Sequence, residues 1–383
     1  MKPKVLLLTS EASPYRLPLF EKLSEKVELE VVFCILKSKK RFWEVKLDSY
    51  SFKYKVLKSI NVGPLIINYL LPFEISLAPY QVIIIDDEPR LTFSKLTVFL
   101  MAKYRHLLRA IRKPIVIWAE SIELGYYNKI NDFVNRYLFW PIRHLIYHYA
   151  DAFLAYGPKT RDFLIKNGIV KEKIYISINA VPETEIKGFM HMIDKEELKE
   201  QLGFSHKKVV LFVGYFTKRK GVVELINAFK QLNRNDTILI MVGAGPEEKR
   251  LKVLAEGYSN IYFPGYLEKE EKAKYYAIAD IFVLPTFVDP WPLVINEAMM
   301  FGLPIITTTG CGASELIKGN GIVIKPGDID ALRESMKYLI ENDEVRTKMG
   351  AKSKEIIKEY TIDKAVERIV EVVHAVLNKG VKR

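Results

Sequence analysis

Short apolar runs rich in Val and Ile recur along the chain, and each is followed by a longer stretch with apolar residues at helical spacing. Strands buried on both faces need no polar alternation, so this pattern predicts parallel strands joined by helices. In the first half the predicted strands are 5–9, 29–34, 82–86, 115–118 and 152–156. In the second half they are 209–214, 237–243, 261–264, 281–285, 304–308 and 321–324. Alternating apolar and polar residues over 42–57 predict an added hairpin.

The two series of strands are separated by residues 179–208, which open with Asn-Ala-Val-Pro and contain a polar helix candidate at 194–203. We place the domain boundary there, which gives domains at 1–180 and 181–360. Residues 361–383 are expected to form a helix that packs back toward the first domain. The predicted fold class is α/β, with two doubly wound Rossmann-like domains facing across a cleft and ligands at the carboxyl ends of the strands.

The charge of the chain is uneven. In total, 58 Lys and Arg against 46 Asp and Glu leave a formal net charge of +12. Residues 1–190 hold 29 basic and 19 acidic side chains, a surplus of ten, whereas residues 191–383 hold 29 and 27, a surplus of two. A one-sided surplus favours an acidic partner, such as nucleic acid, an anionic membrane or an acidic substrate. A lysine-rich solvated surface is the plainer alternative.

Two predicted basic helices in the first half favour an anionic membrane as the acidic partner. Arg105, Arg109 and Arg112 form one helical stripe, and residues 136–149 interleave aromatic side chains with Arg and His. Such helices can lie at an anionic membrane surface, although ordinary packing on the sheet explains 101–112 slightly better. Nucleic acid is disfavoured, because no recognised binding module accompanies these residues.

The apolar segments and the cysteines indicate the cellular compartment in which the protein resides. No segment has the roughly 20 apolar residues of a membrane span, and the start of the chain is interpreted as a buried strand rather than a signal peptide. Cys34 and Cys311 form neither a zinc motif nor a disulfide framework, which favours a reducing compartment. We therefore expect a cytoplasmic protein, peripheral at the inner face of the cell membrane.

The most informative segment for chemistry is 209–221, in which a buried strand leads to a tight turn with Lys218, Arg219 and Lys220 before a helix at 222–232. Cations and backbone N–H groups at a helix N-terminus suit a phosphate, because point charge and helix dipole add there. The segment is not a P-loop, and a basic surface turn is an equal alternative. A second strand ends in a turn with Gly243 and Gly245, which alone is a weak signal.

Two carboxylates flank the start of another predicted helix. The strand before it ends at Pro285, the following loop carries Asp289, and the helix runs from near Pro292 to before Gly302 with Glu297 inside it. Such carboxylates can reach opposite ends of one polar ligand while the helix N-terminus faces an anion. Alternatively, Asp289 caps the loop and Glu297 is a solvated helix residue.

No metal site is predicted. Asp328 and Asp330 open a helical pattern, so a helix N-cap with a first-turn carboxylate explains them better than a chelating pair. His144 and His148 are spaced i, i+4, but no HExxH motif surrounds them. A solvated or interfacial helix face is the better interpretation of the two histidines.

Taken in order along the chain, these motifs resemble those of the retaining, nucleotide-sugar-dependent glycosyltransferases of family four. The similarity touches most of the chain and is strongest over 205–327. This chain has Tyr215 where the family commonly has Arg, Asp289 where it has Glu, and Pro292 where Gly often precedes the helix. The motifs are Gly214-x5-Lys220-Gly221, Gly243-x-Gly245-Pro246, Phe263-x-Gly265-Tyr266, Asp289-x7-Glu297, Gly319-Asn320-Gly321 and the early stretch 13–20, Ser-Pro-Tyr-Arg-Leu-Pro-Leu-Phe.

The resemblance implies the two-domain GT-B fold, with the acceptor on the first domain and the donor on the second. It implies that Lys220, helped by Arg219, meets the donor diphosphate, that Glu297 binds the ribose hydroxyls and that Asp289 lies near the transferred sugar. The remaining donor-binding positions that it implies are Gly214, Gly245, Tyr266 and the backbone of Leu293 and Val294. Glu120, at a strand end of the first domain, is a candidate acceptor-side base or hydroxyl binder, and capping of the next helix explains it equally well.

The predicted function is transfer of a sugar, with retention, from a UDP-, GDP- or ADP-sugar to a saccharide or lipid-linked acceptor, in polysaccharide or glycolipid biosynthesis. No cofactor and no essential metal are expected, because Arg219, Lys220 and the helix dipole can stabilise the leaving diphosphate. Two alternatives remain open: a nucleotide-sugar epimerase of the same fold, and a non-catalytic basic protein that binds a membrane surface.

Overall fold

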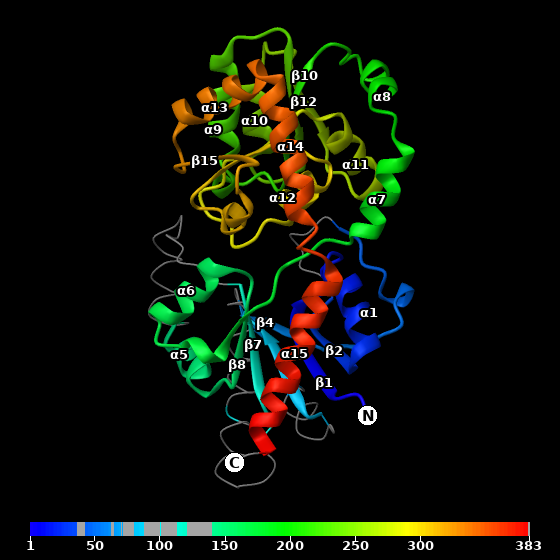
Figure 1. Ribbon diagram of the computed structural model, residues 1–383, viewed down its shortest axis with the longest axis vertical. Coiled ribbons are helices and arrows are strands. Elements are labelled where there is room, and N and C mark those ends of the chain that lie inside the picture. Colours follow the sequence, from blue (N-terminus) through cyan, green and yellow to red (C-terminus); the bar gives the residue numbers. More distant parts are fainter. Residues whose placement is uncertain are drawn as a thin grey trace. The chain divides into compact units, whose positions relative to one another are not determined.

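The computed structural model describes residues 1–36, 43–62, 65–69, 71, 80–87, 100, 113–120 and 140–381. Its internal contacts divide the chain into two compact units, coloured by sequence in Figure 1. Unit 1 comprises Met1–Asn179 together with Ile362–Arg383, and unit 2 comprises Ala180–Thr361. The contacts thus divide the chain after Asn179 and after Thr361, next to the boundaries expected after 180 and 360.

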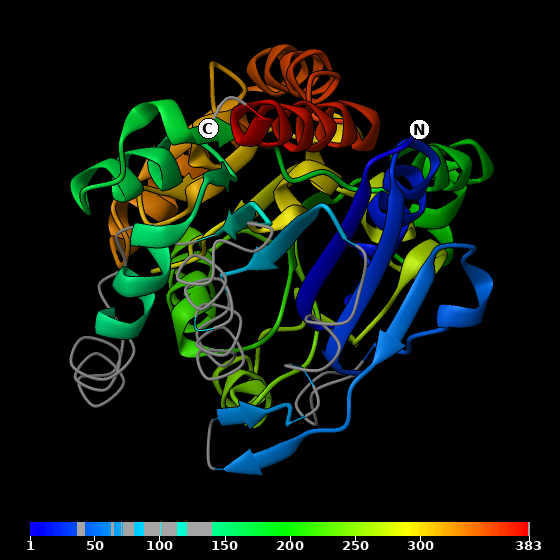
Figure 2. The same cartoon turned by 90° about the horizontal axis from the view of Figure 1, so that it is seen from below.

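Unit 1 is built on a parallel sheet of seven strands in the order β3-β2-β1-β6-β7-β8-β9. Figure 2 shows β1 and β2, in dark blue, side by side. Apolar runs such as 82–86 are fully buried, as expected for strands covered on both faces. The strands are β1 (Lys4–Glu11), β2 (Glu28–Ile35), β3 (Lys53–Val56), β6 (Val82–Asp86), β7 (Ile115–Ala119), β8 (Ala152–Ala155) and β9 (Ile174–Ile176), and the helices include α1 (Leu17–Lys26), α5 (Trp140–Tyr149) and α6 (Pro158–Lys166).

The hairpin predicted over 42–57 is wrong. Strand β3 pairs parallel with β2, in a register that places Glu30 opposite Lys53, so it is an edge strand of the main sheet. An edge strand with one solvated face alternates apolar and polar residues as a hairpin strand does, and alternation therefore does not reveal strand direction. An antiparallel pair follows later in the chain, formed by β4 (Ile60–Val62) and β5 (Leu65–Ile67).

Unit 2 contains a parallel sheet of six strands in the order β12-β11-β10-β13-β14-β15, and all six strands coincide with predicted ones to within one residue at each end. Helix α9 matches the predicted 222–232, and Asp328 caps α13 by accepting a hydrogen bond from the Ala331 N–H at 2.9 Å, as predicted. The strands are β10 (Lys208–Val213), β11 (Thr237–Val242), β12 (Ile261–Gly265), β13 (Ile281–Leu284), β14 (Ile305–Thr308) and β15 (Gly321–Ile324). The helices are α7 (Glu183–Met192), α8 (Lys195–Gln201), α9 (Val222–Leu232), α10 (Glu248–Leu254), α11 (Lys269–Ile278), α12 (Leu293–Met300), α13 (Ile329–Glu341) and α14 (Asp343–Ile357).

The last helix, α15 (Ile362–Val381), belongs to unit 1, where it packs against α1 and lies beside it in Figure 1. Its apolar stripe is fully buried, which explains why the chain returns to this unit after completing unit 2. Burial of five such side chains contributes an upper estimate of about 10 kcal/mol. The stripe consists of Ala365, Ile369, Val372, Val373 and Val376.

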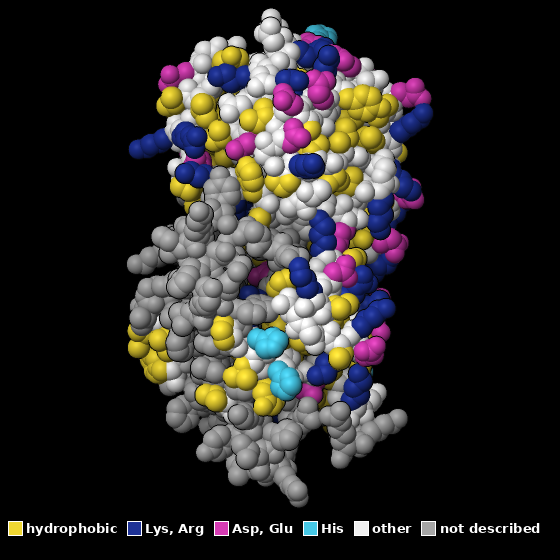
Figure 3. Space-filling model, turned by 90° about the vertical axis from the view of Figure 1, so that its left-hand side faces the viewer, with side chains coloured by type: hydrophobic (Ala, Val, Ile, Leu, Met, Phe, Trp, Pro, Cys, Tyr) yellow, Lys and Arg dark blue, Asp and Glu magenta, His cyan; other side chains and the backbone are white. Residues whose placement is uncertain are grey.

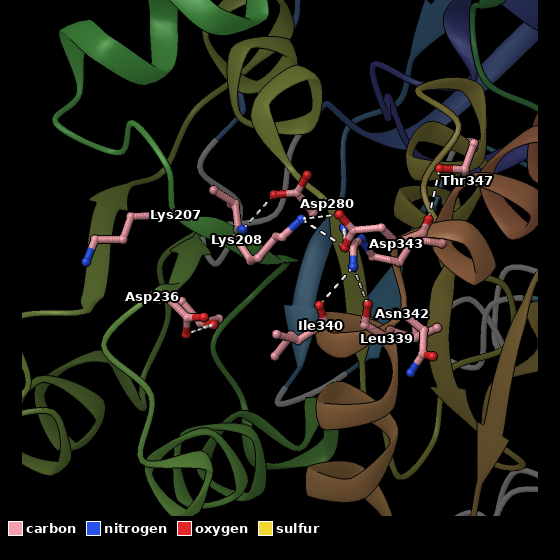
Figure 4. Close-up of polar contacts among 12 residues, drawn as sticks. Lys207, Lys208, Asp236, Asp280, Leu339, Ile340, Asn342, Asp343 and Thr347 are labelled. Atoms are coloured by element: carbon pink, nitrogen blue, oxygen red, sulfur yellow. Dashed lines mark hydrogen bonds and ion pairs between the residues drawn. The ribbon is translucent and has the colours of Figure 1, made fainter.

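An ionic network stabilises the amino-terminal edge of the unit 2 sheet, and Figure 4 shows the part of it around Asp280, Lys208 and Asp343. The Asp280 carboxylate, just before β13, accepts from the Val209 N–H of β10 at 2.8 Å and from Lys199 of α8 at 3.1 Å. Burial would raise the pKa of Asp280, but Lys195 and Lys199 outweigh it and hold that pKa below its usual value. Lys208 binds Asp343 of α14 at 3.0 Å. These contacts stabilise one edge of the sheet, while the opposite, carboxyl-terminal edge carries the predicted site residues.

Candidate functional site

The predicted site residues of unit 2 gather where its sheet changes winding direction. The chain runs from β10 outward to β11 and β12, then returns to place β13 on the other side of β10. Loops that leave two adjacent strands in opposite directions open a crevice at their carboxyl ends, which is where α/β proteins bind ligands. The turn after β10 and the loop after β13, both singled out from the sequence, meet at this switch point.

Hydrogen bonds fix the two loops to each other. The Arg219 carbonyl accepts from the Phe287 N–H at 2.7 Å and from the Thr286 hydroxyl at 2.9 Å. In return, the Arg219 guanidinium donates to the Val288 carbonyl at 2.9 Å. Gly221 allows this close approach, because its φ is +68° and an added Cβ would lie 2.1 Å from the Pro285 carbonyl oxygen. The basic turn is therefore an integral part of the site rather than a free surface loop.

Asp289 and Lys220 form a buried ion pair at the centre of this arrangement. Each side chain is only 9% exposed, and the Lys220 ammonium donates directly to the carboxylate. Arg219 lies 3.5 Å from the same carboxylate, but its side chain is 45% exposed. Burial would raise the pKa of Asp289, and Lys220 and Arg219 outweigh it and hold that pKa below its ordinary value. Two cations thus face one carboxylate, which leaves a surplus positive charge toward solvent at Arg219.

A helix N-terminus adds to this positive potential. Helix α12 begins at Leu293, as predicted, after the N-cap residue Pro292, whose side chain makes no capping hydrogen bond. The first N–H groups of an α-helix have no partner within the helix, so those of Leu293 and Val294 are suited to an anion. Asp289 also accepts a hydrogen bond from the Trp291 backbone, which fixes the loop just ahead of the helix.

The glycine turn after β11 joins the same edge of the sheet. The Phe216 N–H donates to the Ala244 carbonyl at 2.9 Å, and an added Cβ on Gly245 would lie 2.5 Å from the Phe216 carbonyl oxygen. Gly214 donates its N–H to the Val242 carbonyl at 3.0 Å. Tyr266 follows β12 and is 39% exposed. Gly214, Gly245 and Tyr266 therefore lie on the loops of the carboxyl edge.

Glu297 has partners of its own on α11. Its carboxylate accepts from Lys272 at 2.7 Å and from the Tyr276 hydroxyl at 2.8 Å. The side chain is 14% exposed, so it is not the solvated helix residue of the alternative interpretation. Asp289 and Glu297 thus belong to two separate polar clusters, one with the cations of the β10 turn and one between α11 and α12.

Unit 1 has an equivalent switch point between β1 and β6. Arg16, which follows β1, lies 3.6 Å from Asp86 at the end of β6 and 3.7 Å from Glu120 after β7. Arg16 also donates to the Tyr156 hydroxyl and packs over the Trp118 ring. Glu120, a predicted site residue, therefore stands beside a buried guanidinium.

Arg16 and Asp86 were not predicted as site residues, yet the sequence carried a signal for both. Arg16 lies within the resembling stretch 13–20, and Asp86 ends a predicted strand. Both side chains are almost fully buried. Among the described residues, Asp86 Oδ1 and Arg16 Nε have no hydrogen-bond partner.

The predicted basic surface of unit 1 is only partly described. Arg105, Arg109 and Arg112 lie outside the described residues. In α5, Arg143 does not face solvent: it is buried and pairs with Asp87 and Tyr147. For Arg143, that finding corrects the interpretation of 136–149 as a stretch whose basic side chains lie at a membrane surface, because its partner is a buried carboxylate. On the face drawn in Figure 3, Lys and Arg side chains of unit 2 are interspersed with Asp and Glu.

Within the described ranges, no three or more His, Cys, Asp or Glu side chains are grouped as they would be around a metal ion. No helix in the part of the chain that the structure covers is long and apolar enough to cross a bilayer.

Two doubly wound α/β units, the second with cations, a carboxylate and a helix N-terminus at its switch point, are the architecture of GT-B proteins. Residues 194–356 match the family model described as glycosyl transferases group 1. An uncharacterized glycosyltransferase of Methanocaldococcus jannaschii is 28% identical over 267 residues, which cover 67% of this chain and 66% of that protein. A Corynebacterium glutamicum GDP-mannose-dependent monoacylated alpha-(1-6)-phosphatidylinositol monomannoside mannosyltransferase is 34% identical over 170 residues, 41% of this chain and 45% of that protein.

The chain thus spans roughly half to two thirds of the length of the curated relatives it matches. Among solved structures, Anabaena HepE in complex with UDP superposes with a TM-score of 0.76 at 18% identity, covering 97% of this chain and 100% of HepE. This likeness confirms the predicted fold. The family match and the relatives support a glycosyltransferase.

Proposed function

We propose that this protein is a retaining glycosyltransferase that binds a nucleotide-sugar donor at the switch point of unit 2. The observation that carries the proposal is that Asp289 pairs with Lys220 and Arg219 and also accepts from the Trp291 backbone just ahead of α12, all within residues matched by the glycosyltransferase model. Positive charge from side chains and from helical N–H groups converges there, and a donor diphosphate is the anion it suits.

In the proposed reaction, negative charge develops on the leaving diphosphate and has to be stabilised. The bond between the anomeric carbon and the diphosphate oxygen breaks, and the nucleoside diphosphate leaves with the bonding electrons. Arg219, the exposed member of the cation pair, and the N–H groups of Leu293 and Val294 stabilise that charge. The acceptor oxygen attacks the same face of the sugar, and its proton passes to the departing phosphate oxygen. Asp289 holds Lys220 in place and borders the transferred sugar.

The relatives support particular classes of donor and acceptor for this proposal. HepE was solved with UDP and the Corynebacterium enzyme is GDP-mannose-dependent, so we propose a UDP- or GDP-sugar as the donor. For the acceptor we propose a saccharide or lipid-linked saccharide at the carboxyl edge of the unit 1 sheet, at an anionic membrane surface. Glu120 is the proposed hydroxyl binder there, because it is 30% exposed and oriented by Arg16.

The test is an acceptor-dependent turnover assay. The protein is incubated with UDP-glucose, GDP-mannose or ADP-glucose, with and without pooled lipid-linked and free oligosaccharides, and release of nucleoside diphosphate is measured. We expect release with one donor that depends on acceptor and falls at least about tenfold in Arg219→Met. The anomeric configuration of the product is read by NMR. An epimerised donor formed without acceptor would indicate the epimerase instead, and no turnover with any donor would contradict the proposal.

A further inference from the structure

Besides the cluster of Arg219, Lys220 and Asp289, unit 2 has a polar cluster between α11 and α12, in which Glu297 accepts two hydrogen bonds. Lys272 donates to Oε1 at 2.7 Å, and the Tyr276 hydroxyl donates to Oε2 at 2.8 Å. The two donors come from successive turns of α11, and the acceptor comes from α12. Each carboxylate oxygen therefore has one fixed partner, and the orientation of the carboxylate plane is set by the protein.

Tyr276 is a rigid and permanent donor. Its side chain is almost fully buried, and its ring stacks on Phe301 at a centroid distance of 5.4 Å and packs against Phe282 at 5.9 Å. Burial, followed by the nearby Glu297 carboxylate, raises the pKa of Tyr276 well above its ordinary value. The phenol is therefore protonated at neutral pH, and it donates to Glu297.

The held carboxylate keeps unused accepting capacity. A carboxylate has about four lone-pair sites, two on each oxygen. The hydrogen bonds from Lys272 and Tyr276 use one site on each oxygen, which leaves one on each. Two acceptor sites on the adjacent oxygens of one fixed group match two hydroxyl donors on adjacent carbons. Glu297 is partly exposed, at 14%, so part of its side chain remains open to solvent.

From this geometry we propose that Lys272 and Tyr276 are positioning residues that make the site select ribonucleotides over deoxyribonucleotides. They hold Glu297 so that both of its oxygens accept from the 2′- and 3′-hydroxyl groups of one ribose. The inference rests on the proposed function, because it takes the ligand to be a nucleotide. The new element is that selection of ribonucleotides over deoxyribonucleotides depends on α11. A mobile glutamate would lose conformational entropy when it binds the ribose, whereas Glu297 is already held in one orientation.

The test compares ribonucleotides with their 2′-deoxy counterparts by isothermal titration. UDP, GDP and ADP are titrated first, and the one that binds best is compared with dUDP, dGDP or dADP. We expect the wild-type protein to bind the ribonucleotide about tenfold or more tightly, because the lost hydroxyl donates to a charged group. In Lys272→Met and Tyr276→Phe the ratio should fall at least about threefold, while affinity for the deoxynucleotide changes less than about twofold.

Matched controls come from the same helix. Lys274→Met removes a cation that pairs only with exposed glutamates among the described residues, and Tyr275→Phe removes a neighbouring phenol. Both should retain the wild-type ratio. Lys272 is the more exposed of the two positioning residues, so Lys272→Met keeps the test decisive if Tyr276→Phe proves unstable in a thermal melt.

The possible outcomes distinguish failure of this inference from failure of the proposed function. Tight ribonucleotide binding without discrimination by the wild-type protein overturns the inference and leaves the proposed function intact. Discrimination that persists in Lys272→Met and Tyr276→Phe shows a purely structural role for α11 and also overturns it. Failure of UDP, GDP and ADP to bind at all overturns the proposed function, and with it this inference.

Discussion

The ion pair between Lys220 and Asp289 allows a quantitative test of how the site is built. Two unit charges about 4 Å apart attract by about 4 kcal/mol at an effective dielectric constant of 20. Removing both ions from water costs several kcal/mol each, so the net contribution of an intact buried pair is small. Removing one partner leaves a buried charge uncompensated, which costs about 3–5 kcal/mol. The two changes should therefore be strongly non-additive.

The expected pattern is asymmetric. Lys220→Met leaves Asp289 with a second cation, because Arg219 still lies 3.5 Å away. Asp289→Asn leaves the Lys220 ammonium without a carboxylate, because among the described side chains Asp289 is its only ion-pair partner. We expect Asp289→Asn to cost about 3–5 kcal/mol and Lys220→Met less. The double variant should cost less than Asp289→Asn alone, with a coupling energy of at least about 2 kcal/mol.

The assay is equilibrium urea unfolding of the two single variants and the double variant, followed by tryptophan fluorescence. Unit 2 contains one tryptophan, Trp291, which lies two residues after Asp289 and is buried. Lys218→Met, which removes an exposed cation from the same turn, is the matched control and should stay within about 0.5 kcal/mol of wild type. Additive costs, or single-variant costs no larger than that of Lys218→Met, would refute this account of the pair.

Three further predictions concern stability and reactivity. Because the folded pKa of Asp289 lies below its unfolded value, its contribution to stability is complete above about pH 4 and is lost as the pH falls through the folded pKa. Urea midpoints measured between pH 6 and pH 2.5 should therefore fall more steeply in the wild type than in Asp289→Asn, and parallel curves would contradict this. Gly221→Ala should cost at least about 2 kcal/mol in thermal or urea unfolding, from left-handed strain plus the clash with Pro285. Gly257→Ala, at φ +80° with open space around the Cβ, should cost about 1 kcal/mol, and equal costs would refute the clash. Burial raises the pKa of Cys311 to about 12, so a thiol reagent at pH 8 should modify it only in urea, and rapid native labelling would show that it is accessible.

Strand positions were predictable because buried parallel strands are continuous apolar runs. Every predicted strand outside the hairpin over 42–57 is present, whereas Ile174–Ile176 was missed, because three half-buried residues carry too little signal. Strand direction was not predictable at the sheet edge, and the hairpin over 42–57 was wrong for that reason.

The individual motifs of unit 2 were visible in the sequence, and the contacts among them were not. Asp289 and Lys220 are 69 positions apart and are brought together only by the crossover of the sheet. Lys272 and Tyr276 gave no signal, because their helix has an ordinary charged pattern and their role depends on packing against α12.

The two units repeat one physical arrangement at their switch points. In unit 1 the pair is Arg16 and Asp86, and in unit 2 it is Lys220 and Asp289. Each pair joins the segment after the first strand of its sheet to the strand or loop beyond the crossover. A buried cation and carboxylate at this position hold together loops that would otherwise diverge. Each pair has a more accessible charged neighbour, Glu120 at 30% exposure or Arg219 at 45%, and these are the residues for which we propose ligand contacts.

The proposed function requires that Arg219, in the turn after β10, binds the donor diphosphate. The most direct measurement is isothermal titration of UDP, GDP and ADP, and of the corresponding nucleosides, against the wild type, Arg219→Met and Lys337→Met, the last being an exposed cation on α13. We predict that one nucleoside diphosphate binds, that Arg219→Met weakens it at least about tenfold without affecting the nucleoside, and that Lys337→Met changes neither. Equal affinities in all three proteins, or no binding of any nucleoside diphosphate, would contradict the claim.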